Sequence, residues 1–123
     1  MRFVTSIILS LVIGATAASA MDANSFYLKA QALKDKGMAA MFSSDVKLLM
    51  GEMKTVSTQV KAENDAATKV GKPLYCPPAK RKRTSADEII QRLGAMPEAR
   101  RKTLSMKAFW LQFAREKYPC GTT

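Results

Sequence analysis

The sequence predicts an all-α fold, a small helical bundle of about four helices closed by one disulfide bond. Three observations predict it. Apolar residues recur at helical spacing along the chain, and no stretch shows a sustained period of two. The dipeptides typical of tight β-hairpins, such as Asn-Gly, are missing. The 123 residues leave room for one domain, and the chain carries two cysteines.

Residues 1–20 have the layout of a secretory signal peptide. Met1-Arg2 is a short positive start, residues 3–15 are mostly apolar, and Ala18-Ser19-Ala20 supplies the small residues that a signal peptidase reads. A transmembrane anchor would need roughly 20 apolar residues, and this run is shorter and interrupted by polar ones. We therefore expect cleavage after Ala20, a periplasmic protein, and a single helical domain over residues 21–123.

The first predicted helix has Asn24 or Ser25 as its N-cap. Its apolar face consists of Phe26, Ala30, Leu33, Ala40 and Met41. Gly37 falls on that same face, where it either ends the helix or lets a neighbouring element approach closely.

The second predicted helix is the clearest, with Ser43 or Ser44 as its cap and Asp45 in its first turn. Its apolar residues fall within an arc of roughly 120°; they are Val46, Leu49, Met50, Met53, Val56 and Val60. The opposite side is predicted to face solvent, and it carries Lys47, Lys54, Lys61, Glu52 and Glu63. The pattern fades near Lys69.

Residues 71–83 are predicted to form a loop, because one glycine and three prolines exclude a continuous helix there. A third helix follows, in which Ser85 and Glu88 form a capping box ahead of Ile89, Ile90 and Leu93. Residues 94–97 end it.

The last predicted helix runs from about Thr103 to Lys117 and is apolar on two sides. One face carries Leu104, Ala108 and Leu111, and the other carries Met106, Phe109 and Phe113 with Trp110 beside them. Such a helix is normally covered on both sides. Either it is the central helix of the bundle, or one side meets a partner chain as in a homodimer.

Export gives the two cysteines, Cys76 and Cys120, an oxidising environment that favours a disulfide bond between them. A disulfide that closes the loop between residues 76 and 120 should stabilise the fold by roughly 4 kcal/mol in the chain-entropy model. The alternative is two free, buried thiols.

A family resemblance arises from the segments around these cysteines. They are Leu74-Tyr75-Cys76-Pro77-Pro78, then a capped helix, Met96-Pro97-Glu98, and a final helix ending in Tyr118-Pro119-Cys120. Together they resemble the Rap/Tai immunity proteins, over roughly residues 74–120. The resemblance implies a small exported helical protein that neutralises a peptidoglycan amidase delivered by type VI secretion, and it makes a homodimer plausible.

Catalysis finds little support in the composition. The chain has no histidine, which excludes Ser-His-Asp and Cys-His catalysis and imidazole-ligated zinc. Most of the ten acidic residues stand beside Lys or Arg on predicted solvent faces, and no glycine-rich phosphate loop occurs. We expect no enzyme, no catalytic residue, no metal and no cofactor.

The excess of basic residues indicates an anionic partner. Loss of residues 1–20 removes Arg2 and lowers the net charge from +10 to +9. Nucleic acid is improbable as a partner for an exported chain, which leaves an acidic protein, a membrane or a wall polymer. We expect the run Lys80, Arg81, Lys82 and Arg83 to steer a secreted amidase, with Tyr75 as an aromatic anchor. The alternatives are a merely solvated loop and a basic envelope protein that associates with anionic membrane or cell-wall polymer.

Overall fold

The computed structural model describes residues 21–81 and 83–121. The predicted signal peptide, residues 1–20, and Lys82 of the basic run lie outside the described residues. The described residues form five α-helices and one 3-10 helix and contain no strand, so the all-α prediction is confirmed. The elements are α1 (Ala23–Lys36), η1 (Gly37–Phe42), α2 (Ser44–Lys69), α3 (Ala86–Gly94), α4 (Glu98–Thr103) and α5 (Met106–Lys117).

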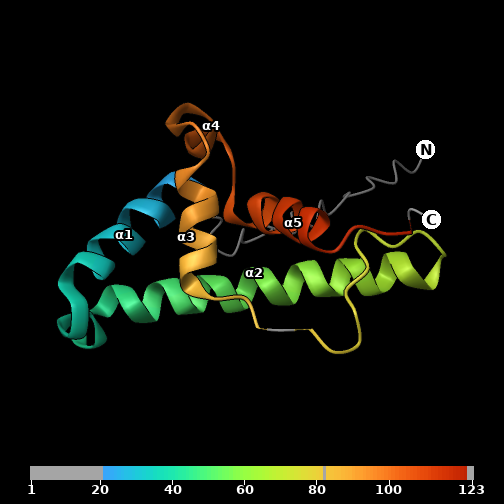
Figure 1. Cartoon of the computed structure of the whole chain (residues 1–123), viewed down its shortest axis with the longest axis horizontal. Coiled ribbons are helices and arrows are strands. Elements are labelled where there is room, and N and C mark those ends of the chain that lie inside the picture. Colours follow the sequence, from blue (N-terminus) through green and yellow to red (C-terminus); the bar gives the residue numbers. More distant parts are fainter. Residues whose placement is uncertain (1–20, 82, 122–123) are drawn as a thin grey trace, which may run out of the picture.

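The long helix α2 runs along the base of the molecule in Figure 1 and packs against α1, η1 and α5. At one end η1 joins it to α1, which rises away from α2 at an angle. Helix α3 stands across the opening between α1 and α2, and α5 lies along the other half of α2. Short α4 sits at the far end of α3. This arrangement leaves a wedge between α1 and α2 that α3 covers in part.

Helix α1 begins earlier than the sequence predicts, and Gly37 ends it. Asp22, not Asn24 or Ser25, is the N-cap; its carboxylate accepts hydrogen bonds from the Ser25 backbone N–H (2.8 Å) and hydroxyl (2.7 Å). Gly37 has φ +59°, a conformation that favours glycine, and a Cβ there would meet nothing within 4 Å. Helix termination, and not close approach of a neighbour, therefore explains this glycine.

Helix α2 follows the prediction at its start but not on its polar face. Ser43 is the N-cap, and Leu49, Val56 and Val60 are buried. Glu52, which we expected in solvent, is only 6% exposed. Its position three residues after Leu49 and four before Val56 places it on the buried side of the helix, where it accepts a hydrogen bond from the Met21 backbone N–H. The solvated-face expectation was wrong for this residue.

The last helix is shorter than predicted. It begins at Met106 and not near Thr103, and residues 98–103 form the separate helix α4. Leu104 and Ser105 between them are extended, with ψ values of 126° and 154°. The Ser105 hydroxyl caps α5 by accepting the Ala108 N–H at 3.1 Å. The Leu104 carbonyl accepts the N–H of Ala23 at 2.8 Å. These bonds to α1 and α5 account for the break.

One hydrophobic core joins α1, α2, α3 and α5. Its largest fully buried side chains are Leu93, Met106 and Val60. Phe109 and Phe113 of α5 are buried, and Leu104, Trp110 and Leu111 pack against the core while partly buried. Helix α5 thus buries one face fully and shields part of the other within this chain. None of the described helices combines the length and the apolar character needed to cross a membrane.

Candidate functional site

The disulfide bond between Cys76 and Cys120 is present, as predicted. It links residues 44 positions apart, with their Cα atoms separated by 4.9 Å. The Cys76 N–H also donates to the Tyr118 carbonyl at 2.8 Å. The C-terminal segment is therefore bound to the start of the loop that precedes α3.

Asn64, near the end of α2, holds the same loop from the other side. Its amide nitrogen donates to the Tyr75 carbonyl at 3.0 Å. Its side-chain oxygen accepts the backbone N–H groups of Leu74 (2.8 Å) and Tyr75 (3.2 Å). Asn64 is buried, so these bonds are shielded from water. Sequence reasoning missed this residue, although it follows Val60 by four positions and so shares its buried side.

Tyr75 does not lie on the surface. It is only 6% exposed and belongs to the hydrophobic core, so its ring is not accessible as an aromatic anchor for a partner. Asn64 and the neighbouring disulfide draw this part of the loop onto α2, which is why the tyrosine is buried. Burial raises the pKa of the Tyr75 hydroxyl, against the opposing effect of the positive charge of Arg81.

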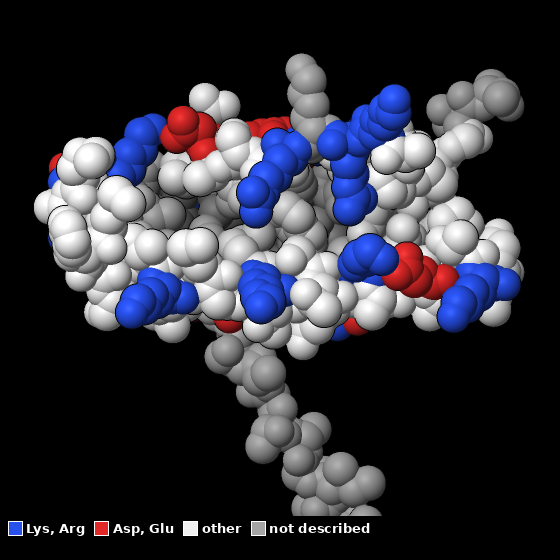
Figure 2. Space-filling view, turned by 90° about the horizontal axis from the view of Figure 1, so that it is seen from below, with Lys and Arg blue, Asp and Glu red and all other residues white. Residues whose placement is uncertain are grey.

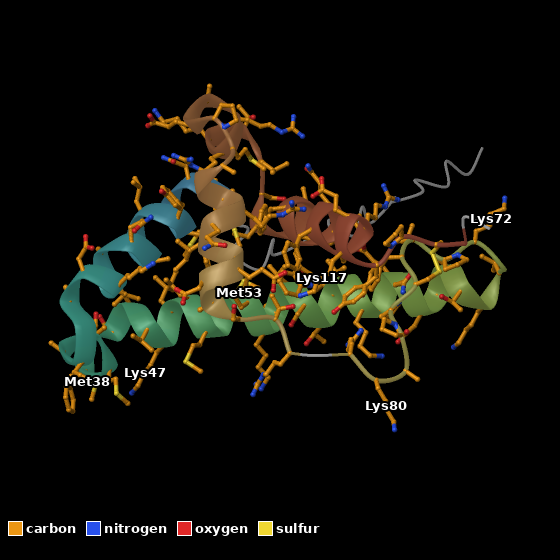
Figure 3. The ribbon with its side chains drawn as sticks, viewed as in Figure 1. Met38, Lys47, Met53, Lys72, Lys80 and Lys117 are labelled. Carbon is orange, nitrogen blue, oxygen red and sulfur yellow. A yellow bond between two sulfur atoms is a disulfide. The ribbon has the colours of Figure 1, made fainter. Side chains whose placement is uncertain are left out.

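The basic loop, residues 80–83, has three described residues, and all three are exposed. Lys80, Arg81 and Arg83 face solvent, and none of them forms an ion pair within the described part of the chain. Lys80 lies on the loop that hangs away from α2 (Figure 3). Seen from below, basic side chains far outnumber acidic ones on the surface of the molecule (Figure 2). Lys47 and Lys54 of α2 are exposed as well.

An open apolar groove, which sequence reasoning did not identify, lies in the wedge between α1, α2 and α3. Its volume is about 400 Å³. Met50 on its rim is 68% exposed, and Met53 lies between α2 and the near end of α3 (Figure 3). The lining residues are Phe26, Ala30, Leu33, Lys34, Leu49, Met50, Met53, Ala86, Asp87, Ile89 and Ile90. Nearly all are apolar, so the groove suits an apolar occupant and not a charged one.

One ion pair crosses the groove. The Lys34 ammonium of α1 and the Asp87 carboxylate of α3 are 3.7 Å apart, and both side chains are largely exposed. Exposed pairs of this kind contribute little stability. A partner entering the groove could therefore displace it at small cost.

The tip of the molecule, defined here as η1, is also apolar and exposed. Met38, Met41 and Phe42 are 81%, 72% and 94% exposed. Met38 and Lys47 lie together at this end of the molecule (Figure 3). Solvent-facing methionine and phenylalanine next to lysine are typical of surfaces that bind a partner or a membrane.

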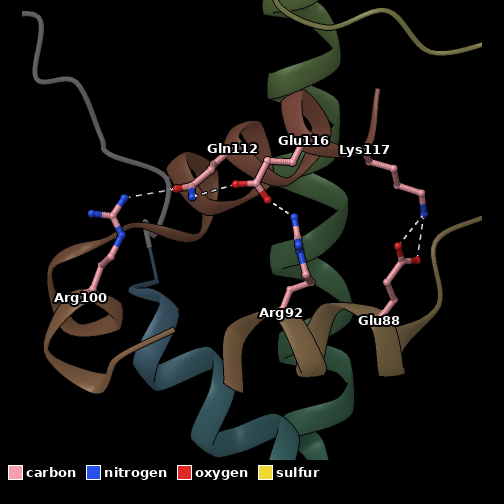
Figure 4. Close-up of polar contacts among 6 residues, drawn as sticks. All are labelled: Glu88, Arg92, Arg100, Gln112, Glu116 and Lys117. Carbon is pink, nitrogen blue, oxygen red and sulfur yellow. Dashed lines mark hydrogen bonds and ion pairs between the residues drawn. The ribbon is translucent and has the colours of Figure 1, made fainter. Parts of the chain in front are cut away.

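A second, smaller hollow of about 270 Å³ lies between α3, α4 and α5. Its rim is held by polar contacts from three helices (Figure 4). Arg92 of α3 pairs with Glu116, Lys117 pairs with Glu88 at 2.9 Å, and Gln112 bridges toward α4. The Ser85 hydroxyl accepts the Glu88 N–H as the capping box predicts, but the Glu88 carboxylate bonds Lys117 and does not reach back. These polar groups already pair with one another, so we interpret them as contacts that hold α3, α4 and α5 together and not as a binding site.

Among the described residues, no three or more His, Cys, Asp or Glu side chains gather as a metal site would require. Comparisons with protein-family models, with curated proteins and with solved structures returned no match for this chain. The resemblance to the Rap/Tai proteins therefore rests on the sequence motifs around Cys76 and Cys120.

Proposed function

We propose that this chain is an exported immunity-type protein that binds and blocks a peptidoglycan amidase, without chemistry of its own. The observation that carries the proposal is the apolar groove between α1, α2 and α3. An open hollow walled by three helices commonly receives an apolar segment of a partner. The motifs around Cys76 and Cys120 support the amidase as that partner, through their resemblance to the Rap/Tai proteins.

The groove has the properties of a receptor for a protein segment. Exposed apolar surface is unfavourable in water, and covering it supplies the driving force for docking. Met50 and Met53 are flexible and polarisable, so they adapt to the shape of what enters. Inhibition further requires that the docking segment lie beside the catalytic cleft of the amidase, so that the body of this protein closes the cleft to peptidoglycan.

The basic loop would speed the encounter with an acidic partner. Lys80, Arg81 and Arg83 are exposed and carry no compensating ion pair among the described residues. The basic loop lies between two anchored points, Cys76 of the disulfide and the Ser85 cap of α3, which reduces the chain entropy lost when it meets a partner. An acidic surface on the amidase would be attracted over about 8 Å at physiological salt.

The groove is tested with two exposed methionines. Met50→Asp places a charge in the groove, and Met41→Asp places the same charge on the tip, away from the groove. The proposal predicts a cysteine amidase gene beside this one, and hydrolysis of peptidoglycan by that amidase is measured with increasing amounts of each variant. Met50→Asp should weaken inhibition at least tenfold, because a carboxylate must be desolvated in an apolar contact, while Met41→Asp inhibits normally. Equal inhibition by both variants, or the lack of an amidase gene in the neighbourhood, would contradict the proposal.

The basic loop is tested through kinetics. Lys80→Glu with Arg83→Glu should slow association with the amidase about tenfold and flatten its dependence on salt. Lys54→Glu with Lys69→Glu changes the net charge equally on α2 and is the matched control. Association rates that both pairs lower to the same extent would show that total charge matters and the loop does not.

The exposed tip favours a second candidate function, association with an anionic membrane surface. Phe42 and Met41 could enter the interfacial region while Lys36 and Lys47 contact lipid phosphates. Co-sedimentation with vesicles containing phosphatidylglycerol should then be strong at low salt, and Met41→Asp with Phe42→Asp should abolish it. Met50→Asp should leave it unchanged, so the two candidates are separated by the same variants.

A further inference from the structure

The first described residues are fixed in the middle of the molecule. The Met21 carbonyl accepts the Met106 N–H at 2.9 Å, and the Ala23 N–H donates to the Leu104 carbonyl at 2.8 Å. Between them, Asp22 and Ser105 form an isolated antiparallel bridge. Since Asp22 caps α1 and Ser105 caps α5, two helices begin at this point. The Met21 backbone nitrogen is therefore held in one place.

That nitrogen faces a buried acid. It lies 3.2 Å from the Oε1 atom of Glu52, to which it donates a hydrogen bond. Glu52 comes from the middle of α2 and is 6% exposed. The contact thus joins the first described residue to a carboxylate 31 positions further along the chain, at the junction of α1, α2 and α5.

A carboxylate at position 52 gains from a positively charged donor at Met21, whatever else it contacts. A glutamine oxygen would accept the N–H of an ordinary peptide bond equally well, and a neutral amide is less costly to bury than a carboxylate. A carboxylate is the better acceptor when the donor carries a positive charge, because charge-assisted hydrogen bonds are about twice as strong as neutral ones. The Met21 nitrogen carries such a charge only if it is the N-terminus of the chain.

Ala18-Ser19-Ala20 directly precedes Met21 in the sequence. We propose that the Ala20–Met21 peptide bond is a proteolytic maturation site, and that the α-ammonium group released there forms a partly buried ion pair with Glu52. Hydrolysis breaks the bond between the Ala20 carbonyl carbon and the Met21 nitrogen. Water supplies the hydroxyl group to Ala20 and a proton to the nitrogen, which takes up a second proton near neutral pH. Removal of residues 1–20 then completes the junction of three helices.

The pairing also defines which bond must be cut. One residue more at the N-terminus would place a neutral amide against Glu52, and one residue less would remove the donor and the Met21 carbonyl that bonds Met106. The inference depends on the predicted cleavage after Ala20 and is independent of the proposed amidase partner, so each can fail without the other.

The test uses the protein exported with its own leader. Intact mass and N-terminal sequencing of the purified protein should show a chain that starts at Met21. An alanine inserted between Ala20 and Met21 keeps the cleavage sequence but moves the charge by one residue. This insertion should lower the melting temperature by at least 5 °C in the natural chain and by less than 2 °C in the Glu52→Gln background, because the ion pair is then already lost.

A second measurement remains informative if Glu52→Gln folds poorly. Labelling of the α-amine by an amine-selective aldehyde at pH 7 should be at least tenfold slower in the natural chain than in the insertion variant, since the paired ammonium is shielded. A different mature N-terminus, an equal effect of the insertion in both backgrounds, or equal labelling rates would overturn the inference.

Discussion

Arg101 is the side chain on which the packing of α4 most depends. It is buried, and its guanidinium donates to the Asn24 side-chain oxygen at 3.2 Å. It also donates to the carbonyls of Leu93 (3.1 Å) and Met96 (2.7 Å), and it lies 4.2 Å above the Tyr27 ring. One cation thus connects α1, the end of α3 and α4.

Replacing it by methionine, Arg101→Met, keeps most of the volume and removes every donor. Hydrogen bonds to a charged group are each worth about 1.5–3 kcal/mol, and buried acceptors without a donor add a cost of their own. Relief from burying a guanidinium offsets part of the loss. We expect the free energy of unfolding to fall by about 3 kcal/mol, and the melting temperature to fall by about 12–24 °C for a domain of this size.

Arg100→Met is the matched control, because the neighbouring arginine on the same helix is exposed and makes one long contact, 3.4 Å, with Gln112. That variant should change the free energy of unfolding by less than about 0.5 kcal/mol. Urea unfolding followed by circular dichroism measures both. A loss below 1 kcal/mol for Arg101→Met, or equal losses for the two variants, would refute the role assigned to the buried guanidinium.

Three further predictions concern the disulfide and two polar residues. Cys76→Ser with Cys120→Ser should lower the free energy of unfolding by about 4 kcal/mol in urea, the loop-closure value for 44 residues; a loss under 1 kcal/mol would contradict the entropic account. Hydrogen bonds from Ser25 hold the pKa of Asp22 below its usual value, so its carboxylate stabilises the fold above about pH 3.9 and ceases to do so as pH falls through the folded-state pKa. Asp22→Asn should therefore cost up to about 1 kcal/mol at pH 7 and less near pH 2, and a difference independent of pH would be inconsistent with this. Asn64→Ala should cost about 2 kcal/mol and speed amide exchange at residues 74 and 75, which hydrogen-exchange NMR measures; unchanged protection would show that the loop is held by other contacts.

Much of the fold follows from local rules that the sequence displays directly. The apolar spacing of Leu49, Val56 and Val60 predicted both α2 and its buried face. Ser43 and Ser85 cap α2 and α3, because a serine side chain satisfies free backbone N–H groups wherever it precedes a helix. The disulfide followed from two cysteines and the expectation of export. Each of these inferences needs only neighbours in the chain or a count of one residue type.

The candidate site did not follow from such rules. Tyr75 looked like an exposed anchor beside a charged loop, yet Asn64 and the disulfide hold it in the core. Glu52 looked like a solvent-facing acid, yet the first described residues of the chain lie across it. In both cases the deciding contact comes from a residue more than ten positions away, and a helical pattern carries no information about what covers a face.

The sequence by itself determined where α1, α2, α3 and α5 lie, the caps Ser43 and Ser85 and the cysteine pair, because hydrogen bonding within a helix and the amphipathic period act over only a few residues. Only the tertiary structure decided that α1 and α2 diverge to leave an apolar groove, and that Arg101, Asn64 and Glu52 are buried at the joints between elements. The physical reason is that the angle between helices depends on the shape of both packed surfaces at once. A buried polar residue is tolerated only where distant groups arrive to bond it.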